Sequence, residues 1–214
     1  MYVLYYSPGS ASMVVHAVLL ETGTLHQLQL VDFGRNEQHG AGYLKLNPTG
    51  MVPTLVVDNV AVQESAALVM LLAERHPEAR LAPPAGTSGR AEWLKWTVHL
   101  SSHLGGLYRQ WFYPSDLGME DYSVAMRDAV RMKIEGTLER IDGHLAQHGP
   151  YLLGNAFSSA DLQLTMYMRW ARNMPRPATT WPYLNALALR VTARPSWIQM
   201  CEIEGLHDWA AAQA

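Results

Sequence analysis

The order of strand and helix patterns along the chain constrains its fold more than any other feature. Within the first 78 residues, short apolar runs alternate with helical patterns in the order strand, helix, strand, then strand, strand, helix. This order is typical of a small α/β unit built around a mixed sheet. Asp58 and Asn59 separate the last two apolar runs and predict a hairpin. We expect strands at residues 3–6, 28–31, 54–57 and 60–62, and helices at residues 12–23 and 64–75.

The composition changes after His76 and Pro77. Residues 83–89 are rich in Pro, Gly, Ser and Thr, which is typical of a linker between domains. The residues beyond this linker show helical patterns without convincing strand alternation. We therefore predict a first domain at residues 1–78, a linker at 79–89 and an all-helical domain at 90–214. The expected helices of that domain are residues 93–104, 122–148, 161–172, 181–193 and 196–204.

Composition excludes several classes of protein. Of the 214 residues, 49% are hydrophobic, which is enough for a sizeable core, and the net charge of -3 without a basic block argues against a nucleic-acid partner. No run reaches the roughly 18 apolar residues of a membrane span. The first residues lack the charged region of a signal peptide. Cys201 is the single cysteine, so we expect neither an internal disulfide nor structural zinc, and we expect a reduced, cytoplasmic compartment.

Three segments, in this order and spacing, carry a resemblance to a known family. They are Tyr5 to Ser12 (YYSPGSAS), Asn47 to Leu55 (NPTGMVPTL) and Gln63 to Ala66 (QESA). Together they resemble the cytosolic glutathione S-transferases, and the likeness extends as far as residues 158–161. The resemblance implies a thioredoxin-like N-terminal domain followed by an all-helical C-terminal domain. It also implies a homodimer that uses glutathione as a co-substrate and no metal.

Ser10 is the first candidate catalytic residue, because it lies between the first expected strand and the first expected helix. A free thiol has a pKa of about 8.5, so only a few per cent of it is thiolate at neutral pH. A hydroxyl that donates to sulfur at a helix N-terminus stabilises the thiolate. We predict that Ser10 activates the thiol of glutathione, and Ser12 is the alternative. Both serines also fit structural roles in the turn and at the helix N-cap.

Other residues of these segments are predicted to bind glutathione. The resemblance implies a cis bond between Val52 and Pro53, so that the backbone of Val52 pairs with the cysteinyl part of the tripeptide. Glu64 and Ser65 open a helix, where free N–H groups suit a carboxylate and Glu64 suits the adjacent ammonium of the γ-glutamyl end. A proline that starts a strand and a capped helix are the structural alternatives. The remaining predicted contacts to glutathione are Ala11, Gln38 and His39.

The helical half contains aromatic clusters that the resemblance connects with the second substrate. The family places its acceptor-substrate pocket between two helices of this half, facing the thiol. We predict that Tyr108, Trp111 and Trp170 line that apolar pocket. By contrast, Ser158 and Asp161 have the spacing of a capping box and predict the start of a core helix.

The chain also departs from the subclasses of the family. Ala11 stands where bacterial members often carry Cys, and Gly105-Gly106 stands where they tend to place His-Lys. The Pro-Gly-Ser order resembles the insect serine-type enzymes, but those often have His at the position of Gly50 and Arg at that of Ala66. The substrate of a subclass therefore cannot be carried over to this chain.

The resemblance implies an enzyme, a glutathione transferase of the detoxification type. It would stabilise the thiolate of glutathione and transfer it to small apolar electrophiles, or reduce organic hydroperoxides. Two alternatives stay open: a glutathione-dependent isomerase or lyase, which uses the same thiol, and a non-catalytic adaptor that keeps the fold for protein contacts. The presence of Ser10, Val52 and Glu64 favours an enzyme, since an adaptor has no need of a tripeptide site.

Overall fold

The computed structural model describes residues 1–207 and 209, and these form two compact units. The first unit contains residues 1–82 together with residues 193–207, and the second contains residues 83–192 and Trp209. The sequence predicts a helical domain at residues 90–214, of which residues 208 and 210–214 lie outside the described part of the chain. In the structure, residues 193–207 instead pack within the first unit.

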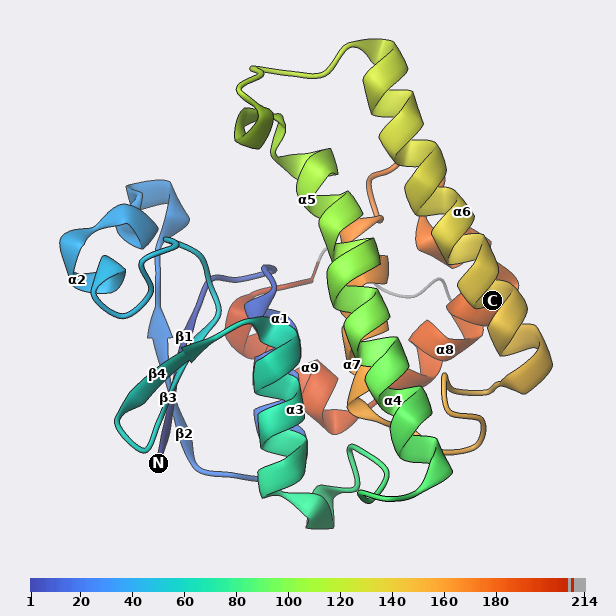
Figure 1. Cartoon of the computed structure of the whole chain (residues 1–214), viewed down its shortest axis with the longest axis horizontal. Helices are drawn as coiled ribbons and strands as arrows, with labels where there is room; N and C mark the ends of the chain where they lie inside the picture. The colour runs from blue at the N-terminus through green and yellow to red at the C-terminus, as the bar shows by residue number, and fades with distance from the viewer. Residues whose placement is uncertain (208, 210–214) are drawn as a thin grey trace. The chain divides into compact units, whose positions relative to one another are not determined.

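A four-stranded mixed sheet forms the centre of the first unit (Figure 1). Its strands are β1 (Tyr2–Tyr6), β2 (His26–Leu30), β3 (Thr54–Val57) and β4 (Val60–Gln63). Their order across the sheet is β2-β1-β3-β4, with β1 parallel to β2 and the other two pairs antiparallel. The predicted thioredoxin-like arrangement and the hairpin at Asp58 and Asn59 are confirmed.

Two helices bury one face of this sheet. Leu4 and Leu55 oppose each other across β1 and β3, and both are completely buried. They share this core with the apolar residues of α1 (Ser12–Glu21) and α3 (Ser65–Arg75), which pack against each other. Burial of these side chains is the main favourable contribution to the stability of the unit. The helix α9 (Pro195–Glu204) packs against α1 and completes the unit.

The opposite face of the sheet carries a short helix at one end only. Side chains alternate along a strand, so Tyr5 and Thr54 point away from the face of Leu4 and Leu55. Tyr43 of α2 (Ala41–Leu44) forms a hydrogen bond of 2.9 Å with Thr54. The polar, Gly-rich sequence of residues 34–42 predicts a loop. This segment instead contains α2 and two 3₁₀ turns, η1 (Phe33–Arg35) and η2 (Glu37–His39).

The second unit consists of helices. Its first three helical segments follow one another without a break: α4 (Ser88–His99), the π-turn η4 (Leu100–Gly105) and α5 (Gly106–Phe112). The sequence predicts a single shorter helix at residues 93–104, whereas these segments extend from residue 88 to residue 112. A Cβ at Gly105 would lie 2.6 Å from the hydroxyl of Tyr167, so this glycine allows the π-turn to approach a neighbouring helix closely. The other helices are α6 (Val124–His148), α7 (Ser159–Trp170) and α8 (Pro182–Thr192).

The predicted capping box at the start of α7 is confirmed. Asp161 is fully buried and accepts hydrogen bonds from the N–H of Ser158, the hydroxyl of Ser158 and the N–H of Leu152. Burial raises the pKa of Asp161 to about 6, although these three hydrogen bonds act in the opposite direction. The remaining short 3₁₀ turns are η3 (Pro77–Ala79), η5 (Pro114–Leu117) and η6 (Ala178–Thr180).

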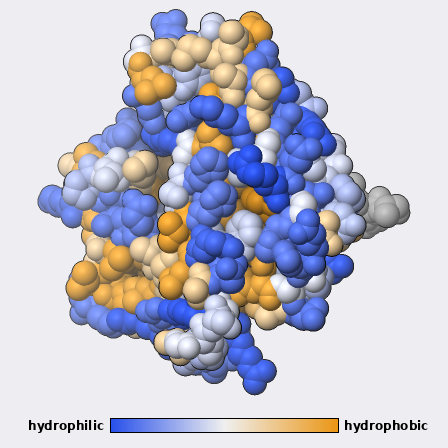
Figure 2. Space-filling model, turned by 45° about the vertical axis from the view of Figure 1, so that its right-hand side comes forward, coloured by the Kyte–Doolittle hydropathy of each residue, from blue (hydrophilic) through white to orange (hydrophobic). Residues whose placement is uncertain are grey.

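The surface of the molecule mixes polar and apolar side chains. Figure 2 shows hydrophobic patches interleaved with hydrophilic residues on the face in view. Leu25 and Val124 are among the most exposed apolar side chains, at 88% and 80%. Exposed single apolar residues are ordinary in folded proteins. None of the described helices is both long enough and apolar enough to cross a bilayer.

Candidate active site

The strand register brings four segments of the chain to one end of the sheet. Tyr5 pairs with Thr54, and Thr54 pairs with Gln63. The segments that follow β1 and β4 and the segment that precedes β3 therefore lie together. Tyr6 pairs with Leu30, so the segment after β2 begins at the same end. The residues predicted to bind glutathione or to act on its thiol all belong to these four segments: Ser10, Ala11, Ser12, Gln38, His39, Val52, Pro53, Glu64 and Ser65.

The two serines of the first turn differ in their surroundings. Ser12 is completely buried, and its hydroxyl donates to the carbonyl of Ser7 at 3.1 Å and accepts from the N–H of Ser7 at 3.3 Å. Ser10 is half-buried, and its Oγ lies 2.8 Å from the Oγ of Ser12. Since Ser12 gives its only hydroxyl proton to Ser7, Ser10 is the donor between the two hydroxyls. Ser10 can therefore reach a ligand by rotating its hydroxyl, whereas Ser12 is fixed inside the turn.

Ser12 is not the N-cap of α1, which was the structural role that its sequence position suggested. The N-cap position is Ala11, whose side chain cannot cap the helix, and the N–H of Ser12 donates to the hydroxyl of Ser10 at 3.2 Å. Ser12 joins the helix to the end of β1 instead of bonding to the N–H groups of the first helical turn. The N–H of Ala11 finds no acceptor in the described part of the chain. A free N–H group at a helix start, next to the Ser10 hydroxyl, favours an anion at this position.

A buried carboxylate from the far end of the sequence supports the same turn. Glu204, at the end of α9, accepts a hydrogen bond of 3.1 Å from the N–H of Gly9. Its other oxygen lies 2.9 Å from Nδ1 of His16 on α1, and both side chains have no exposed surface. A carboxylate can only accept, so Nδ1 of His16 carries the proton of this bond. Sequence analysis missed both residues, because no local pattern links positions 188 residues apart.

Val52 offers an unpaired backbone edge. The bond between Val52 and Pro53 is cis, as the resemblance implied. Neither the N–H nor the C=O of Val52 has a hydrogen-bond partner among the described residues. Val52 is only half-buried. An extended peptide can pair with such an edge as an added strand does.

The segment before Val52 is held by two side chains that sequence analysis did not select as functional. The hydroxyl of Tyr43 and the amide of Asn47 both donate to the carbonyl of Met51, at 2.6 Å each. Tyr43 and Asn47 are buried. The peptide that precedes Val52 is therefore fixed from the side of α2. Asn47 belongs to the NPTGMVPTL segment, so part of this signal was present in the sequence.

Glu64 and Ser65 open α3 at the same end of the sheet. Glu64 is the N-cap residue and adopts φ 72°, which is unusual for a residue with a side chain. Backbone strain of this kind concentrates at functional sites. The Glu64 side chain is exposed, and Ser65 is buried to 9% exposure. The N–H groups of the first helical turn are free for a ligand carboxylate, since the first bond into the helix runs from Leu68 to the carbonyl of Glu64.

Gln38 and His39 lie beside the turn that leads to Val52. A Cβ at Gly50 would lie 2.8 Å from Nδ1 of His39, and Gly50 has φ 64°. Gln38 donates to Asn36, while its own carbonyl oxygen is buried without a partner among the described residues. The structure therefore places the side chain of His39 and the backbone carbonyl of Gln38 next to the segment that precedes β3. A direct contact between them and glutathione stays a prediction.

The aromatic residues predicted for the acceptor pocket have different environments within the second unit. Tyr108 is completely buried, and its ring stacks on Tyr167 at 5.8 Å and meets Trp170 edge-on at 5.7 Å. Trp170 is half-buried, and Trp111 lies under the guanidinium of Arg127. Because Tyr108 has no exposed surface, a role in lining a pocket requires this cluster to open. The pocket role of these residues stays a prediction.

The described residues contain no group of three or more His, Cys, Asp or Glu side chains arranged to hold a metal ion. The predicted site presents hydroxyl, carboxylate and backbone groups. These groups form an end-of-sheet site with free N–H donors, an unpaired strand edge and an exposed carboxylate. This combination suits a short, zwitterionic peptide.

Both halves of the chain match models of protein families. Residues 4–80 match the model described as Glutathione S-transferase, N-terminal domain, and residues 125–212 match Glutathione S-transferase, C-terminal domain. The glutathione S-transferase GstA of Escherichia coli O157:H7 is 27% identical over 206 residues, which cover 95% of this chain and 98% of GstA.

Solved structures of glutathione transferases are similar to this chain over nearly its whole length. A glutathione transferase from Methylococcus capsulatus strain Bath is 30% identical, with a TM-score of 0.87 over 96% of this chain and 100% of the other. A sphingomonad glutathione S-transferase in complex with glutathione is 29% identical, with a TM-score of 0.85 over 95% of this chain and 99% of the other. The similarity therefore covers both compact units.

Proposed function

Because the chain belongs to the glutathione S-transferase superfamily, we propose that it binds glutathione at the end of the sheet and activates the thiol of this peptide. The unpaired N–H and C=O of Val52 are the observation that carries the proposal. They suit the cysteinyl residue of an extended tripeptide, which pairs with them as a strand would.

The two ends of glutathione are assigned by charge. The free N–H groups at the start of α3 and the hydroxyl of Ser65 bind the γ-glutamyl carboxylate, and Glu64 binds the adjacent ammonium. Gln38 and His39 lie beside the segment that precedes Val52, where they suit the glycine carboxylate at the other end. Pairing at Val52 then directs the thiol of the central residue toward the turn after β1.

Ser10 is the residue proposed to stabilise the thiolate. Its hydroxyl exchanges the bond to Ser12 for a bond to sulfur, while the nearby N–H of Ala11 adds a second positive dipole. A hydrogen bond donated to the anionic form lowers the pKa of the thiol. The thiolate then attacks the electrophilic atom of the second substrate and displaces its leaving group. With a hydroperoxide it attacks the terminal oxygen and breaks the O–O bond, which releases an alcohol and leaves glutathione sulfenic acid. A second glutathione then reduces this acid to glutathione disulfide and water.

The second substrate is proposed to be a small apolar electrophile or an organic hydroperoxide. Trp170 is the best-placed of the three predicted pocket residues, because it is half-buried and part of an aromatic cluster. An apolar aromatic surface of this kind suits an aryl group. We further propose that the enzyme acts as a homodimer.

Binding and assay of the intact protein test this function. We expect reversible binding of glutathione with a Kd from about 1 μM to 1 mM. We also expect turnover of an aryl halide or of cumene hydroperoxide. Isothermal titration calorimetry measures the first, and absorbance assays measure the second. A well-folded sample that gives no heat with millimolar glutathione would exclude the proposed function. Binding without turnover of either substrate would favour an isomerase, a lyase or an adaptor.

A further inference from the structure

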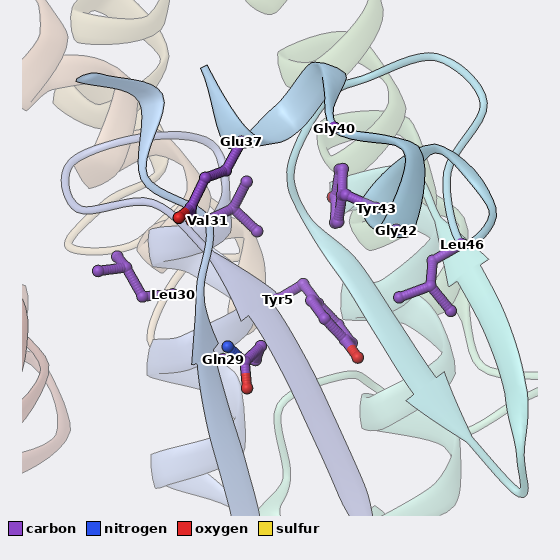
Figure 3. A pocket seen from close by; sticks show the side chains of 9 residues that line it. All are labelled: Tyr5, Gln29, Leu30, Val31, Glu37, Gly40, Gly42, Tyr43 and Leu46. Atoms are coloured by element: carbon purple, nitrogen blue, oxygen red, sulfur yellow. The ribbon is translucent and has the colours of Figure 1, made fainter. Parts of the chain in front are cut away.

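A cavity of about 370 Å³ lies on the face of the sheet that α2 partly covers. Figure 3 shows its lining residues coming from two sides of the first unit. One side is formed by β1, β2 and the residue after β2, and the other by the segment from η2 to the residues that follow α2. The lining residues are Tyr5, Gln29, Leu30, Val31, Glu37, Gly40, Gly42, Tyr43 and Leu46.

This cavity is separate from the proposed glutathione site. None of its lining residues is among those proposed to bind glutathione or to act on the thiol. Tyr5 points to the face of the sheet opposite to the buried Leu4. The two regions share one supporting residue, Tyr43, whose hydroxyl is occupied by Met51 and Thr54. Because its hydroxyl is already bonded, Tyr43 lines the cavity with its ring only.

The walls combine aromatic and apolar surface. The rings of Tyr5 and Tyr43 lie 5.8 Å apart and are tilted by 48°. Leu30, Val31 and Leu46 supply aliphatic surface around them. Rings at such distances are in direct contact, so the two tyrosines form one aromatic surface against which a planar ring can pack. A volume of this size suits a ligand of one or two rings.

The charged and polar groups of the lining specify the rest of the ligand. Glu37 is the one formally charged residue among those that line the cavity, and Lys, Arg and His do not occur there. One oxygen of Glu37 accepts from the N–H of Asp32 at 2.9 Å, which holds the carboxylate in place. A cationic donor can bond to the second oxygen of Glu37 and to the amide oxygen of Gln29. The electron-rich faces of the two tyrosines also attract a cation.

We propose that this cavity is a second small-molecule site, which binds an aromatic amine in its protonated form. The ring packs against Tyr5 and Tyr43, and the ammonium group bonds to Glu37. This inference goes beyond glutathione chemistry and does not depend on it. A compound of this class can therefore occupy the cavity while glutathione occupies the end of the sheet.

Benzylamine and benzoate form a matched pair of probes, because they share a ring and differ in the sign of charge. We expect benzylamine to bind with a Kd of about 1–10 mM, as suits so few heavy atoms. Backbone amide NMR should show shifts centred on Gly40 and Gly42, with or without saturating glutathione. Benzoate should bind at least about fivefold more weakly.

Two variants localise the site. Glu37→Gln should weaken benzylamine binding by roughly two- to fivefold, the effect of one partly exposed charge pair. A Cβ at Gly42 meets nothing within 4 Å, so Gly42→Phe is tolerated and brings a ring to the cavity wall, and it should reduce binding at least about tenfold. Gly143→Phe on α6, where a Cβ also meets nothing within 4 Å, is the matched control and should leave binding unchanged.

Three results would overturn the proposal. One is the absence of shifts at Gly40 and Gly42 up to about 20 mM benzylamine. Another is equal binding of benzoate. The third is unchanged affinity in both Glu37→Gln and Gly42→Phe. Each of these results leaves the binding of glutathione untouched, because neither variant alters a residue proposed for that peptide.

Discussion

At the scale of single residues, hydrogen bonding separates two serines that are neighbours in the sequence. Ser12 is buried with both donor and acceptor functions satisfied by Ser7, whereas Ser10 is half-buried and makes its donor bond to another hydroxyl. The sequence could place both serines in the turn but could not choose between them. The choice depends on the side chain that closes the turn, and this is visible only in three dimensions.

Substitution of the two serines should have opposite effects. Ser12→Ala leaves the buried N–H of Ser7 without its partner, while the C=O of Ser7 keeps only the N–H of Ser10. It should cost about 1–3 kcal/mol of stability, with the pKa of bound thiol nearly unchanged. Ser10→Ala should cost less stability, raise the pKa of the thiol of bound glutathione by about one unit or more, and lower turnover by roughly 10- to 1000-fold at neutral pH. Titration of thiolate absorbance against pH measures the pKa. If Ser12→Ala raises that pKa and Ser10→Ala does not, the roles are reversed.

Glu64 gives a second prediction at this scale. Its exposed carboxylate is proposed to meet the ammonium of glutathione, so Glu64→Ala should weaken binding by about 10- to 150-fold, the usual range for a hydrogen bond between charged groups. Calorimetry with glutathione measures the change. Glu139→Ala removes an exposed glutamate from α6 and should bind as the wild type does. Equal affinity of the two variants for glutathione would show that Glu64 does not bind this peptide.

At the scale of elements, the regular segments were predictable and the irregular ones were not. Strands β3 and β4 begin where the apolar runs and the hairpin at Asp58 and Asn59 place them. The segment from η1 to α2 was missed because its turns are short and its sequence is polar and rich in glycine. Its order comes from partners elsewhere, such as the bonds from Tyr43 to Met51 and Thr54. Such contacts leave no periodic pattern.

The start of α7 yields a prediction about pH. Burial raises the pKa of Asp161 to about 6, above its value near 4 in an unfolded chain. The folded state then binds more protons between these two values, so the contribution of Asp161 to stability falls as the pH rises from 4 to 6. The free energy of unfolding of the wild type, relative to Asp161→Asn, should decrease by on the order of 1–3 kcal/mol over this interval.

Urea unfolding at several pH values, monitored by tryptophan fluorescence, gives this difference. The Asn variant keeps the size of the side chain and does not titrate, so effects of other groups cancel in the comparison. A difference that increases as the pH rises would mean that the hydrogen bonds from Leu152 and Ser158 outweigh burial.

At the scale of the whole molecule, the family and the order of its two halves could be predicted from three short segments. The packing of α9 within the first unit could not be predicted, because the helical pattern of residues 195–204 does not indicate which helix it packs against. This packing places Cys201 in the same unit as the turn that carries Ser10 and Ala11. A test for thiol chemistry of the protein itself must therefore control for this cysteine.

We expect negligible reduction of mixed disulfides by this protein. Exchange of the glutaredoxin type needs a protein thiolate beside glutathione, and the turn carries Ala11 where a cysteine would be required. Ala11→Cys should introduce measurable activity in a coupled assay with hydroxyethyl disulfide. Strong activity of the wild type that persists in Cys201→Ser would contradict the proposed site.

Glu204 should be needed for stability although it is remote in sequence from every predicted site residue. Glu204→Gln replaces one acceptor oxygen by an amide, so either Gly9 or His16 loses its partner in a buried position. The variant should lose about 1–3 kcal/mol of stability and bind glutathione less tightly. Glu202→Gln, on the exposed side of the same helix, should match the wild type in urea unfolding. Equal stability of both variants would show that this carboxylate is dispensable.

The bond between Gly9 and Glu204 also concerns how the protein is made. The 195 positions between them take about 10 to 40 seconds to translate at 5–20 residues per second. Once residue 82 has been made, the nascent chain contains the strands and helices of its first 82 residues but still lacks the carboxylate that receives the N–H of Gly9. A ribosome-bound chain arrested before α9 should therefore have a sheet without a finished turn. The turn would then bind glutathione at full affinity only after α9 has been made.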